Sequence, residues 1–460
     1  MRVTLRIYKL SRVKERHILS KIIIIGGGAA GMMSAIVAAR QKHQVTIIEQ
    51  QSKLGRKILS TGNGRCNFTN EMQNPSCYRS SNPDFPFGVI EQFPFDDTIE
   101  FFKELGVYPK SREGYIYPNS DQATSVVDTM MMELKKLKVE ILLNTRCEII
   151  TLHHPSHFSI LIKNLEEASS KSEVATFKTG TFHELYGDKV ILTTGGKAAP
   201  VLGSDGSGYD LAKSLGHRIV PVFPSLVQLR CQESFYKQLA GLRMEGRVSI
   251  HVGERKVAED TGEIQLTDYG ISGIPVFQVS GIVAQELSKR NNVLGVLNFM
   301  PQLSREEVVE LLNQRVENNP DKKIGEFFIG LFPKKFGDLL VKLCELCPKE
   351  KVSHLKKHNQ IMISKMAEHI TAFETKIIAT NSFEQAQVCS GGVDTREINP
   401  GTMESLLAKN LYFAGEVVDV DGICGGYNLQ WAWSSGFIAG SSAAKECTET
   451  NDEKPVGNLL

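Results

Sequence analysis

The sequence predicts an α/β fold built on a parallel β-sheet, and three observations lead to this prediction. Residues 22–25 are four consecutive isoleucines, which is typical of a strand buried on both faces of a parallel sheet. A glycine-rich turn follows, and then a predicted helix over residues 29–41. Residues 45–48 form a second β-branched strand. Strand, helix and strand in this order form the unit from which parallel sheets are built.

The turn between the first strand and the helix has the G-x-G-x-x-G spacing of dinucleotide-binding turns. Its first glycine permits the tight turn, its second lets the backbone approach a pyrophosphate, and its third lets the helix pack closely on the strand. The free N–H groups at the helix N-terminus attract the phosphates. An acidic residue at the end of the second strand can accept hydrogen bonds from ribose hydroxyls. We therefore predict a Rossmann-type dinucleotide site with contacts from Gly26, Gly28, Ala29, Ala30, Gly31, Glu49 and Gln50.

Composition narrows the class of protein. A chain of 460 residues has room for two or three domains, and its net charge of +1 does not suggest a nucleic-acid or membrane-surface protein. No apolar run approaches the roughly 20 residues that a membrane helix needs. Nine cysteines without paired spacing are typical of a reducing compartment. We expect a cytoplasmic protein that acts on a small molecule, without a nucleic-acid or membrane partner; its oligomeric state stays open.

Residues 1–20 are predicted to be a basic extension outside the folded domains. They hold six Lys and Arg residues against one Glu, and they lack the apolar core of a secretory signal. Either they form a disordered tail, or they are upstream sequence included by an early start codon, and we favour the second interpretation. Residues 448–460 are predicted to be a C-terminal tail.

A polar, glycine-rich stretch over residues 53–70 follows the second strand and is predicted to be a long loop. Its position after the ribose-binding strand favours a ligand cradle over a surface Ω-loop. Glycines permit close backbone approach, and amides and guanidinium groups can donate to an electron-rich ring. The predicted contacts are Arg56, Lys57, Thr61, Gly62, Asn63, Gly64, Arg65 and Asn67.

The next part of the chain is predicted to complete the first half of the nucleotide-binding domain, residues 21–220. Residues 83–137 are expected to be mainly helical, with Asn119, Ser120 and Asp121 capping a long amphipathic helix. Residues 139–191 alternate like a β-meander inserted between strands of the sheet. The apolar strand from residue 189 ends at Thr194, Gly195 and Gly196, and this end resembles the strand end that lies near the cofactor in FAD-binding proteins. A helix starts at residues 206–209.

Residues 221–380 are predicted to form an inserted domain that covers the ligand. Short alternating strands indicate a small β-barrel over about 221–301 and 366–380. A capping box from Ser304 to Glu307 opens a helical subdomain over about 303–365. Cys344 and Cys347 lie within it, but no further Cys or His pair completes a zinc site, so we predict helix packing and no metal.

Residues 381–447 are predicted to return to the nucleotide-binding domain. A strand over residues 411–414 leads to a glycine-rich loop and to a helix that begins near residue 427. A second helix N-terminus at the site favours a ligand as long as FAD, because a helix dipole stabilises the negative charge that a reduced flavin develops. The predicted contacts are Gly415, Glu416, Gly425, Gly426, Tyr427, Asn428 and Leu429.

These motifs resemble a flavoprotein family that contains aminoacetone oxidase and BaiN-type bile-acid reductases. The resemblance rests on GGGAAG at residues 26–31, GRKILSTGNGRCN at 55–67, and AGE followed by GGYN at 414–428. This sequence has Tyr115 and Asp268 where the family commonly has Arg and His. The resemblance implies FAD as cofactor, with Glu416 at a ribityl hydroxyl and residues 425–428 at the pyrimidine edge.

The predicted function is that of an FAD-dependent oxidoreductase. With a single dinucleotide fingerprint, NAD(P)H has no domain of its own and would dock transiently as co-substrate. Cys66 and Cys77 are too far apart for a disulfide reductase. Two functions stay open: NAD(P)H-linked reduction of a small or steroid-like unsaturated substrate by hydride transfer through flavin N5, which we favour slightly, and oxidation of an amine with release of hydrogen peroxide.

A third, more remote function is RNA modification, which the lysine-rich residues 322–357 would serve. We favour a solvated helical surface as the explanation of these lysines. For catalysis, the sequence nominates side chains predicted to touch the flavin or to reach it from the insertion. They are Arg65, Cys66, Tyr269 and Tyr427.

Overall fold

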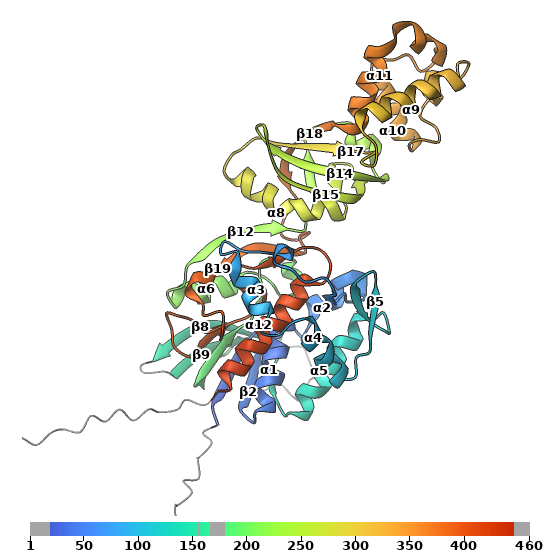
Figure 1. The fold of residues 1–460 in the computed structure, drawn as a ribbon. Coiled ribbons are helices and arrows are strands. Elements are labelled where there is room, and N and C mark those ends of the chain that lie inside the picture. Colours follow the sequence, from blue (N-terminus) through green and yellow to red (C-terminus); the bar gives the residue numbers. More distant parts are fainter. Residues whose placement is uncertain (1–18, 154–156, 166–179, 446–460) are drawn as a thin grey trace, which may run out of the picture.

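The computed structural model describes residues 19–153, 157–165 and 180–445, so the two predicted terminal extensions lie almost wholly outside the described residues. Three parts follow one another along the length of the molecule (Figure 1). An α/β domain is followed by a closed barrel, and a group of helices lies beyond the barrel.

The α/β domain is built on a five-stranded parallel sheet. The strand order is β20 (Leu411–Phe413), β11 (Lys189–Leu192), β1 (Lys21–Ile25), β2 (Gln44–Ile48) and β7 (Glu140–Leu142). Ile22, Ile23 and Ile24 are completely buried, as expected for the middle strand of a sheet covered on both faces. Helix α1 (Ala29–Arg40) connects β1 to β2. The predicted α/β fold class, the first two strands and the helix between them are therefore confirmed.

The predicted β-meander is smaller than its sequence pattern indicates. Only β8 (Thr145–His153), β9 (His157–Asn164) and β10 (Phe182–Gly187) form the separate three-stranded sheet. The segments on either side, β7 and β11, belong to the parallel sheet, because β7 pairs with β2, and β11 pairs with β1 and β20. Their buried apolar residues show the same pattern in either sheet, so only the pairing partner distinguishes the two assignments.

Residues 53–70 are not the continuous loop that the sequence predicts. They contain the short helix α2 (Arg56–Ser60), a 3₁₀ turn over Thr61–Gly64 and the strand β3 (Thr69–Asn70). Ile58 is buried and anchors α2 to the core, which composition alone did not reveal. The turn that follows needs left-handed backbone at two successive residues, Gly62 (φ 56°) and Asn63 (φ 54°), the residue types that best tolerate it.

Residues 83–137 are helical apart from one hairpin. Their elements are α3 (Asp84–Ile90), α4 (Phe95–Glu104), β5 (Pro109–Arg112), β6 (Tyr115–Pro118) and α5 (Ala123–Lys136). The predicted cap of α5 is wrong, because Gln122 is the N-cap residue and no side chain caps this end. Asp121 instead accepts hydrogen bonds from Lys110 Nζ (2.6 Å) and Arg112 Nη2 (2.7 Å), which tie it to the hairpin.

The barrel is closed by six antiparallel strands. In order around it they are β13 (Leu229–Cys231), β16 (Gly270–Ser272), β15 (Arg255–Leu266), β14 (Arg243–Val252), β17 (Val293–Asn298) and β18 (Phe373–Thr380). Helix α7 (Tyr236–Leu239) and the longer α8 (Ile274–Ser288) lie between these strands in sequence. Closure leaves no free sheet edge in the barrel.

Two strands lie between the barrel and the α/β domain (Figure 1). They are β12 (Ile219–Ser225), which follows helix α6 (Ser207–Ser214), and β19 (Val388–Val393). Because β12 pairs with β19 alone, it lies outside the barrel. A second pair beside the domain is formed by β4 (Tyr78–Arg79) and β21 (Asp421–Gly422).

The helical part contains α9 (Arg305–Asn318), α10 (Lys334–Leu343) and α11 (Leu355–Thr371). The predicted capping box is confirmed: Glu307 N donates to Ser304 Oγ (3.2 Å), and Ser304 N donates to Glu307 Oε2 (2.7 Å). Cys344 is completely buried, in agreement with a packing role, whereas Cys347 is exposed, so the predicted packing role is wrong for Cys347.

Helix α12 (Tyr427–Ala443) packs directly across α1, and small residues make this contact possible (Figure 1). A Cβ atom on Gly436 would lie 2.7 Å from the Ala30 carbonyl oxygen, and one on Gly440 would lie 2.6 Å from the Ser34 carbonyl oxygen. Ser34 Oγ donates to the Gly436 carbonyl oxygen across the contact (2.8 Å).

The close contact between these helices predicts the effect of a single methyl group. We expect Gly440→Ala to lower the free energy of unfolding by about 1–3 kcal/mol, because the backbones must separate to admit the side chain. Gly88→Ala in α3 is the matched control, since a Cβ atom there meets no atom within 4 Å. Urea unfolding followed by circular dichroism measures both variants, and equal midpoints would contradict the prediction.

Candidate functional site

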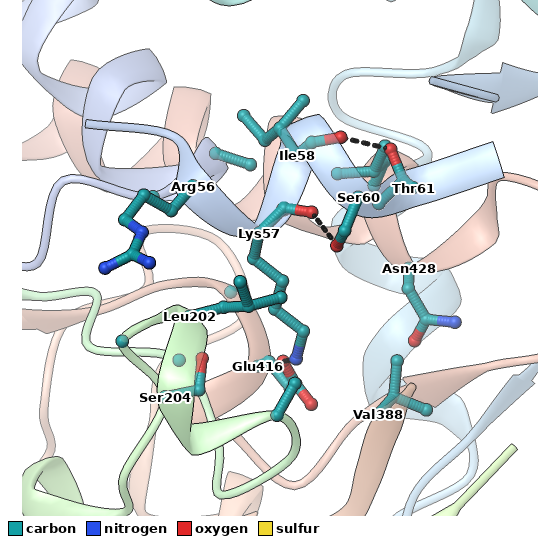
Figure 2. Close-up of a pocket in the computed structure, with 18 of the residues that line it drawn as sticks. Arg56, Lys57, Ile58, Ser60, Thr61, Leu202, Ser204, Val388, Glu416 and Asn428 are labelled. Carbon is teal, nitrogen blue, oxygen red and sulfur yellow. Dashed lines mark hydrogen bonds and ion pairs between the residues drawn. The ribbon is translucent and has the colours of Figure 1, made fainter. Parts of the chain in front are cut away.

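A single elongated cavity of about 720 Å³ follows the C-terminal edge of the parallel sheet. Its walls come from the turn after β1, from α2 and its 3₁₀ turn, from the N-terminal end of α12, and from segments near β12 and β19. Figure 2 shows part of this cavity, with α2 on one side and Glu416 and Val388 facing it. Ligands of open α/β sheets bind at this edge, so the cavity is the candidate site.

The turn after β1 approaches the cavity in the way that the glycine spacing predicts. Gly26 has φ +106°, and a Cβ atom on Gly28 would meet no atom within 4 Å, so bare backbone faces the open space. Gly31 does not line the cavity. A Cβ atom on Gly31 would lie 1.9 Å from the Gly26 carbonyl oxygen, so this glycine serves the close packing of helix and strand.

Glu49 holds this turn in place as well as lining the cavity. Gly27 N donates to its Oε2 (2.7 Å), and Gln51 N donates to its Oε1 (2.8 Å). Burial raises the pKa of the Glu49 carboxyl above its ordinary value, and these backbone donors and Arg56 act in the opposite direction. Each carboxylate oxygen retains a lone pair for a further donor such as a ribose hydroxyl.

Residues beyond the turn complete this end of the cavity, and sequence reasoning missed them. They come from the start of β8, from the segment that leads into α6 and from α6 itself. They are Thr145, Arg146, Cys147, Ser204, Ser207 and Leu211. No motif marks them, because they reach the cavity only through the way the three-stranded sheet and α6 pack on the parallel sheet.

An ion pair occupies the middle of the cavity wall. Lys57 Nζ of α2 lies 2.7 Å from Glu416 Oε2, and Figure 2 shows the two side chains in contact. Cys389 N donates to the other oxygen of Glu416 (2.8 Å). Both residues were predicted as cofactor contacts, and they come together from positions 359 residues apart in the sequence.

At the far end, the N-terminus of α12 faces the cavity. Gly425 (φ +123°) and Gly426 (φ +94°) make the turn into the helix, and the N–H groups of a first helical turn have no partner within the helix. Asn67 lies against this turn, since a Cβ atom on Gly426 would be 2.9 Å from Asn67 Oδ1.

The side-chain oxygen Oδ1 of Asn67 indicates whether the cavity end at the N-terminus of α12 fits a flavin ring. This buried oxygen has no hydrogen-bond partner among the described residues, and its residue, Asn67, lines the cavity. An unsatisfied buried acceptor costs about 1–3 kcal/mol, so a ligand N–H group would be favourable there. A flavin ring offers an N–H group beside carbonyl oxygens, and the adjacent helix N-terminus supplies donors for those oxygens. The residues present therefore fit the predicted cofactor.

The wall across from this helix is apolar, and it was not predicted. Segments that enter and leave the barrel provide it, together with the start of α8. Its apolar residues are Leu226, Ile274, Phe277, Ala386 and Val388. The sequence holds no local signal for them, because their position depends on how the barrel sits on the α/β domain.

Most predicted cofactor contacts line this cavity, including Ala29, Ala30, Gln50, Thr61, Thr194, Gly195, Gly415, Asn428 and Leu429. Five do not: Gly31, Gly64, Arg65, Gly196 and Tyr427. Gly196 packs behind the wall, where a Cβ atom would lie 3.0 Å from Glu416 Oε1.

None of the four predicted catalytic side chains lines the cavity. Cys66 is completely buried, and burial raises the pKa of its thiol to about 12. Tyr427 is buried with its ring against Tyr78 (5.8 Å between centroids). Tyr269 lies on the barrel side, where its hydroxyl accepts a hydrogen bond from Asn381 Nδ2 (3.1 Å). Arg65 is exposed. Their catalytic roles stay predictions, and no contact with the cavity supports these roles.

The described residues show neither a membrane helix nor a metal cluster. No helix among them is long and apolar enough to cross a membrane. In the same part of the chain, no group of three or more His, Cys, Asp or Glu side chains is arranged to hold a metal ion.

The fold and the cavity define the class: a Rossmann-type α/β protein with a cavity at the C-terminal edge of its parallel sheet and an inserted barrel. Comparison with known families agrees, because the model of the HI0933-like protein Rossmann domain matches residues 20–442. The chain belongs to this HI0933-like family.

Named relatives cover nearly the whole chain. A 3-dehydro-bile acid delta(4,6)-reductase from Clostridium scindens is 43% identical over 87% of this chain and 93% of its own length. Ribosomal RNA dihydrouridine synthases from Haemophilus influenzae and Escherichia coli are both 29% identical, over 89% and 86% of this chain and 94% and 90% of their own lengths. The family assignment and the relationship to a reductase confirm the prediction that this chain is an oxidoreductase enzyme.

Gly28 offers a test of the site that leaves the fold intact. We expect Gly28→Ala to weaken FAD binding to the apo-protein by at least about tenfold, because the methyl group fills the space in front of the α1 N-terminus. A tenfold loss corresponds to about 1.4 kcal/mol. The unfolding midpoint should stay unchanged, since no atom lies within 4 Å of the new Cβ. Fluorescence titration measures the affinity, with Gly88→Ala as control, and unchanged affinity would place the pyrophosphate elsewhere.

Proposed function

We propose that this protein is an FAD-dependent oxidoreductase that uses NAD(P)H to reduce a carbon–carbon double bond conjugated to a carbonyl group. The proposed substrate is small and apolar, of steroid-like character. The observation that carries the proposal is the apolar wall of the cavity, which faces the N-terminus of α12 at the end where the residues fit a flavin ring.

The chain's own residues would hold the cofactor along the cavity. The N-terminus of α1 and the backbone at Gly28 would take the pyrophosphate, and Glu49 would accept from a ribose. Glu416, held by Lys57, would accept from a ribityl hydroxyl. The N-terminus of α12 and Asn67 Oδ1 would bind the polar edge of the ring. When bound, FAD supplies a ring nitrogen that accepts and passes on a hydride.

NAD(P)H is proposed as a transient co-substrate. The described chain has one parallel sheet with one glycine-rich turn, which FAD would occupy. A nicotinamide would therefore dock at the same apolar end as the substrate, and the two would bind in turn. The protein's part is to exclude water from this end and to orient each molecule.

The relatives support the choice of substrate. The name of the Clostridium scindens reductase describes double bonds at positions 4 and 6 of a 3-dehydro bile acid, which are conjugated to its ketone. Making dihydrouridine likewise saturates a double bond conjugated to a carbonyl group. Relatives with such different substrates share one reaction, so this chain is proposed to share it too.

The apolar wall favours a lipid-like substrate over the alternatives. A small cationic amine is disfavoured at this end, because burying an ammonium against apolar residues without a compensating partner is unfavourable. An RNA substrate calls for a basic surface. The lysine-rich residues 322–357 contain nine Lys residues against four Asp and Glu residues, and pairs such as Lys334 with Asp338 offset part of this charge.

A visible spectrum taken under anaerobic conditions tests the function directly. We expect a yellow protein that bleaches when NADH or NADPH is added and recovers its colour with a 3-keto-Δ4 steroid. Aminoacetone and a ribosomal RNA fragment are the comparison substrates. Colour that persists with both nucleotides, and peroxide formed from aminoacetone, would favour the amine oxidase, while recovery with RNA alone would favour the RNA-modifying function.

The apolar wall can be tested at Ile274, whose side chain is 56% exposed at the start of α8. We expect Ile274→Lys to raise the KM for a 3-keto-Δ4 steroid about tenfold or more, because a charge there opposes binding of an apolar ligand. Ile361→Lys is the matched control, since Ile361 is 78% exposed on the distant α11. Steady-state kinetics measures both, and an equal KM in the two variants would rule out contact between Ile274 and the substrate.

A further inference from the structure

Tyr115 is an ionisable side chain at the boundary between the α/β domain and the barrel, at the apolar end of the cavity. Tyr115 lies in β6 and lines the cavity, and it is 37% exposed. Its neighbour Ile116 is buried on the other side of the strand, so Tyr115 and Tyr117 both point toward the cavity, as alternation along a strand requires.

The ring of Tyr115 rests on the turn that begins α12. A Cβ atom on Gly425 would lie 2.9 Å from Tyr115 Cε1, so glycine is needed for this contact. Asn70, which pairs with Tyr115 across the strands, donates from Nδ2 to the Gly425 carbonyl oxygen (3.0 Å) and holds the turn against β6. The phenol is thus fixed beside the helix N-terminus that is proposed to bind the ring of the cofactor.

The surroundings of the Tyr115 phenol favour its protonated form. Burial raises the pKa of Tyr115 above its ordinary value, and Cys424, Tyr117 and Asp260 of β15 raise it further. Burial also raises the pKa of the Cys424 thiol to about 12, so the thiol is neutral too. Gln278 of α8 accepts from Cys424 N through Oε1 (2.9 Å), which joins the turn to the inserted domain.

We propose that the Tyr115 hydroxyl is the proton donor in the reduction of the conjugated double bond. This inference rests on the proposed function. The carbon β to the carbonyl gains a hydride that originates from NAD(P)H, and the α carbon gains the proton of Tyr115. The π bond breaks and two C–H bonds form, NAD(P)H is oxidised, and the tyrosinate recovers a proton from water through its exposed side.

Other candidates for the donor are less well situated. Tyr117 lies further along β6, where its Cε1 is 3.5 Å from a Cβ position on Gly62 and Arg112 lies over its ring (5.4 Å to the centroid). Tyr269 does not line the cavity, and Arg230 covers its ring (5.1 Å). Cys424 lies beside Tyr115, but burial raises the pKa of its thiol to about 12, and a thiol is a weak hydrogen-bond donor.

The experiment compares Tyr115→Phe with Tyr108→Phe, each purified with its bound flavin; Tyr108 is exposed and does not line the cavity. Stopped-flow absorbance follows two separate half-reactions: bleaching by NAD(P)H, and recovery of colour on mixing with a 3-keto-Δ4 steroid. In Tyr115→Phe we expect bleaching within about twofold of wild type, and recovery slower by about 10²–10⁴-fold, the usual contribution of a general acid. Tyr108→Phe should stay near wild type in both.

Two measurements do not depend on turnover. Flavin content should be unchanged in Tyr115→Phe, because the ring against Gly425 is kept. The dissociation constant of the saturated 3-keto product, measured by calorimetry, should change by less than about threefold. In addition, the wild-type recovery rate should fall above the ordinary tyrosine pKa of about 10 as the hydroxyl ionises, and the variant should lack this decline.

The outcomes separate this inference from the proposed function. Wild-type protein that bleaches with NAD(P)H but does not recover colour with any carbonyl-conjugated alkene overturns both. Recovery of Tyr115→Phe at the wild-type rate, or an equal loss in Tyr108→Phe, overturns the donor role alone. Loss of flavin or of product binding in Tyr115→Phe also overturns it, because Tyr115 would then act in binding.

Discussion

The close packing of α12 on α1 is the constraint on which the rest of the structure depends. Gly436 and Gly440 bring the two helix backbones together, and Gly31 does the same for α1 and the end of β1. Larger residues at these positions would move the helices apart. The packing directs the N-termini of both helices to one cavity, so that a single elongated ligand can meet a partial positive charge of about half a unit at each of two places.

The polar groups along this cavity are arranged for a ligand that supplies their missing partners. Glu49 is bound by two backbone N–H groups, and Glu416 by Lys57 and Cys389 N, so both carboxylates are fixed before any ligand arrives. Asn67 Oδ1 is left without a partner among the described residues. A ligand that donates a hydrogen bond to Asn67 Oδ1 removes the free-energy cost of leaving this buried oxygen unsatisfied. Binding of such a ligand would stabilise the folded protein.

The inserted barrel completes the cavity, which the α/β domain alone leaves open on one side. Ile274 and Phe277 from α8, and residues 384–388 before β19, provide the wall opposite α12. Arg79 Nη2 donates to the Gln278 carbonyl oxygen (2.7 Å), and Cys424 N donates to Gln278 Oε1, so α8 is tied to the domain by hydrogen bonds at the cavity edge. Substrate and cofactor would then meet at this boundary, where Tyr115 also lies.

The sequence by itself determined the features that depend on local chemistry. The isoleucine run, the spacing of Gly26, Gly28 and Gly31, and the acid Glu49 specified the central β-α-β unit, because each has a backbone or charge requirement that few residue types meet. The capping box at Ser304 could be predicted from the sequence for the same reason. Many of the predicted cofactor contacts line the cavity, since their motifs are contiguous in sequence.

Only the tertiary structure decided the features that depend on residues far apart in the chain. The strands β7 and β11 have the same buried pattern in either sheet, so pairing alone assigned them. The apolar wall and Tyr115 carry no local signal, and they acquire a role when the barrel is docked beside α12. For the same reason the four nominated catalytic side chains could not be judged from sequence, because whether a side chain faces a cavity or the core depends on what packs behind it.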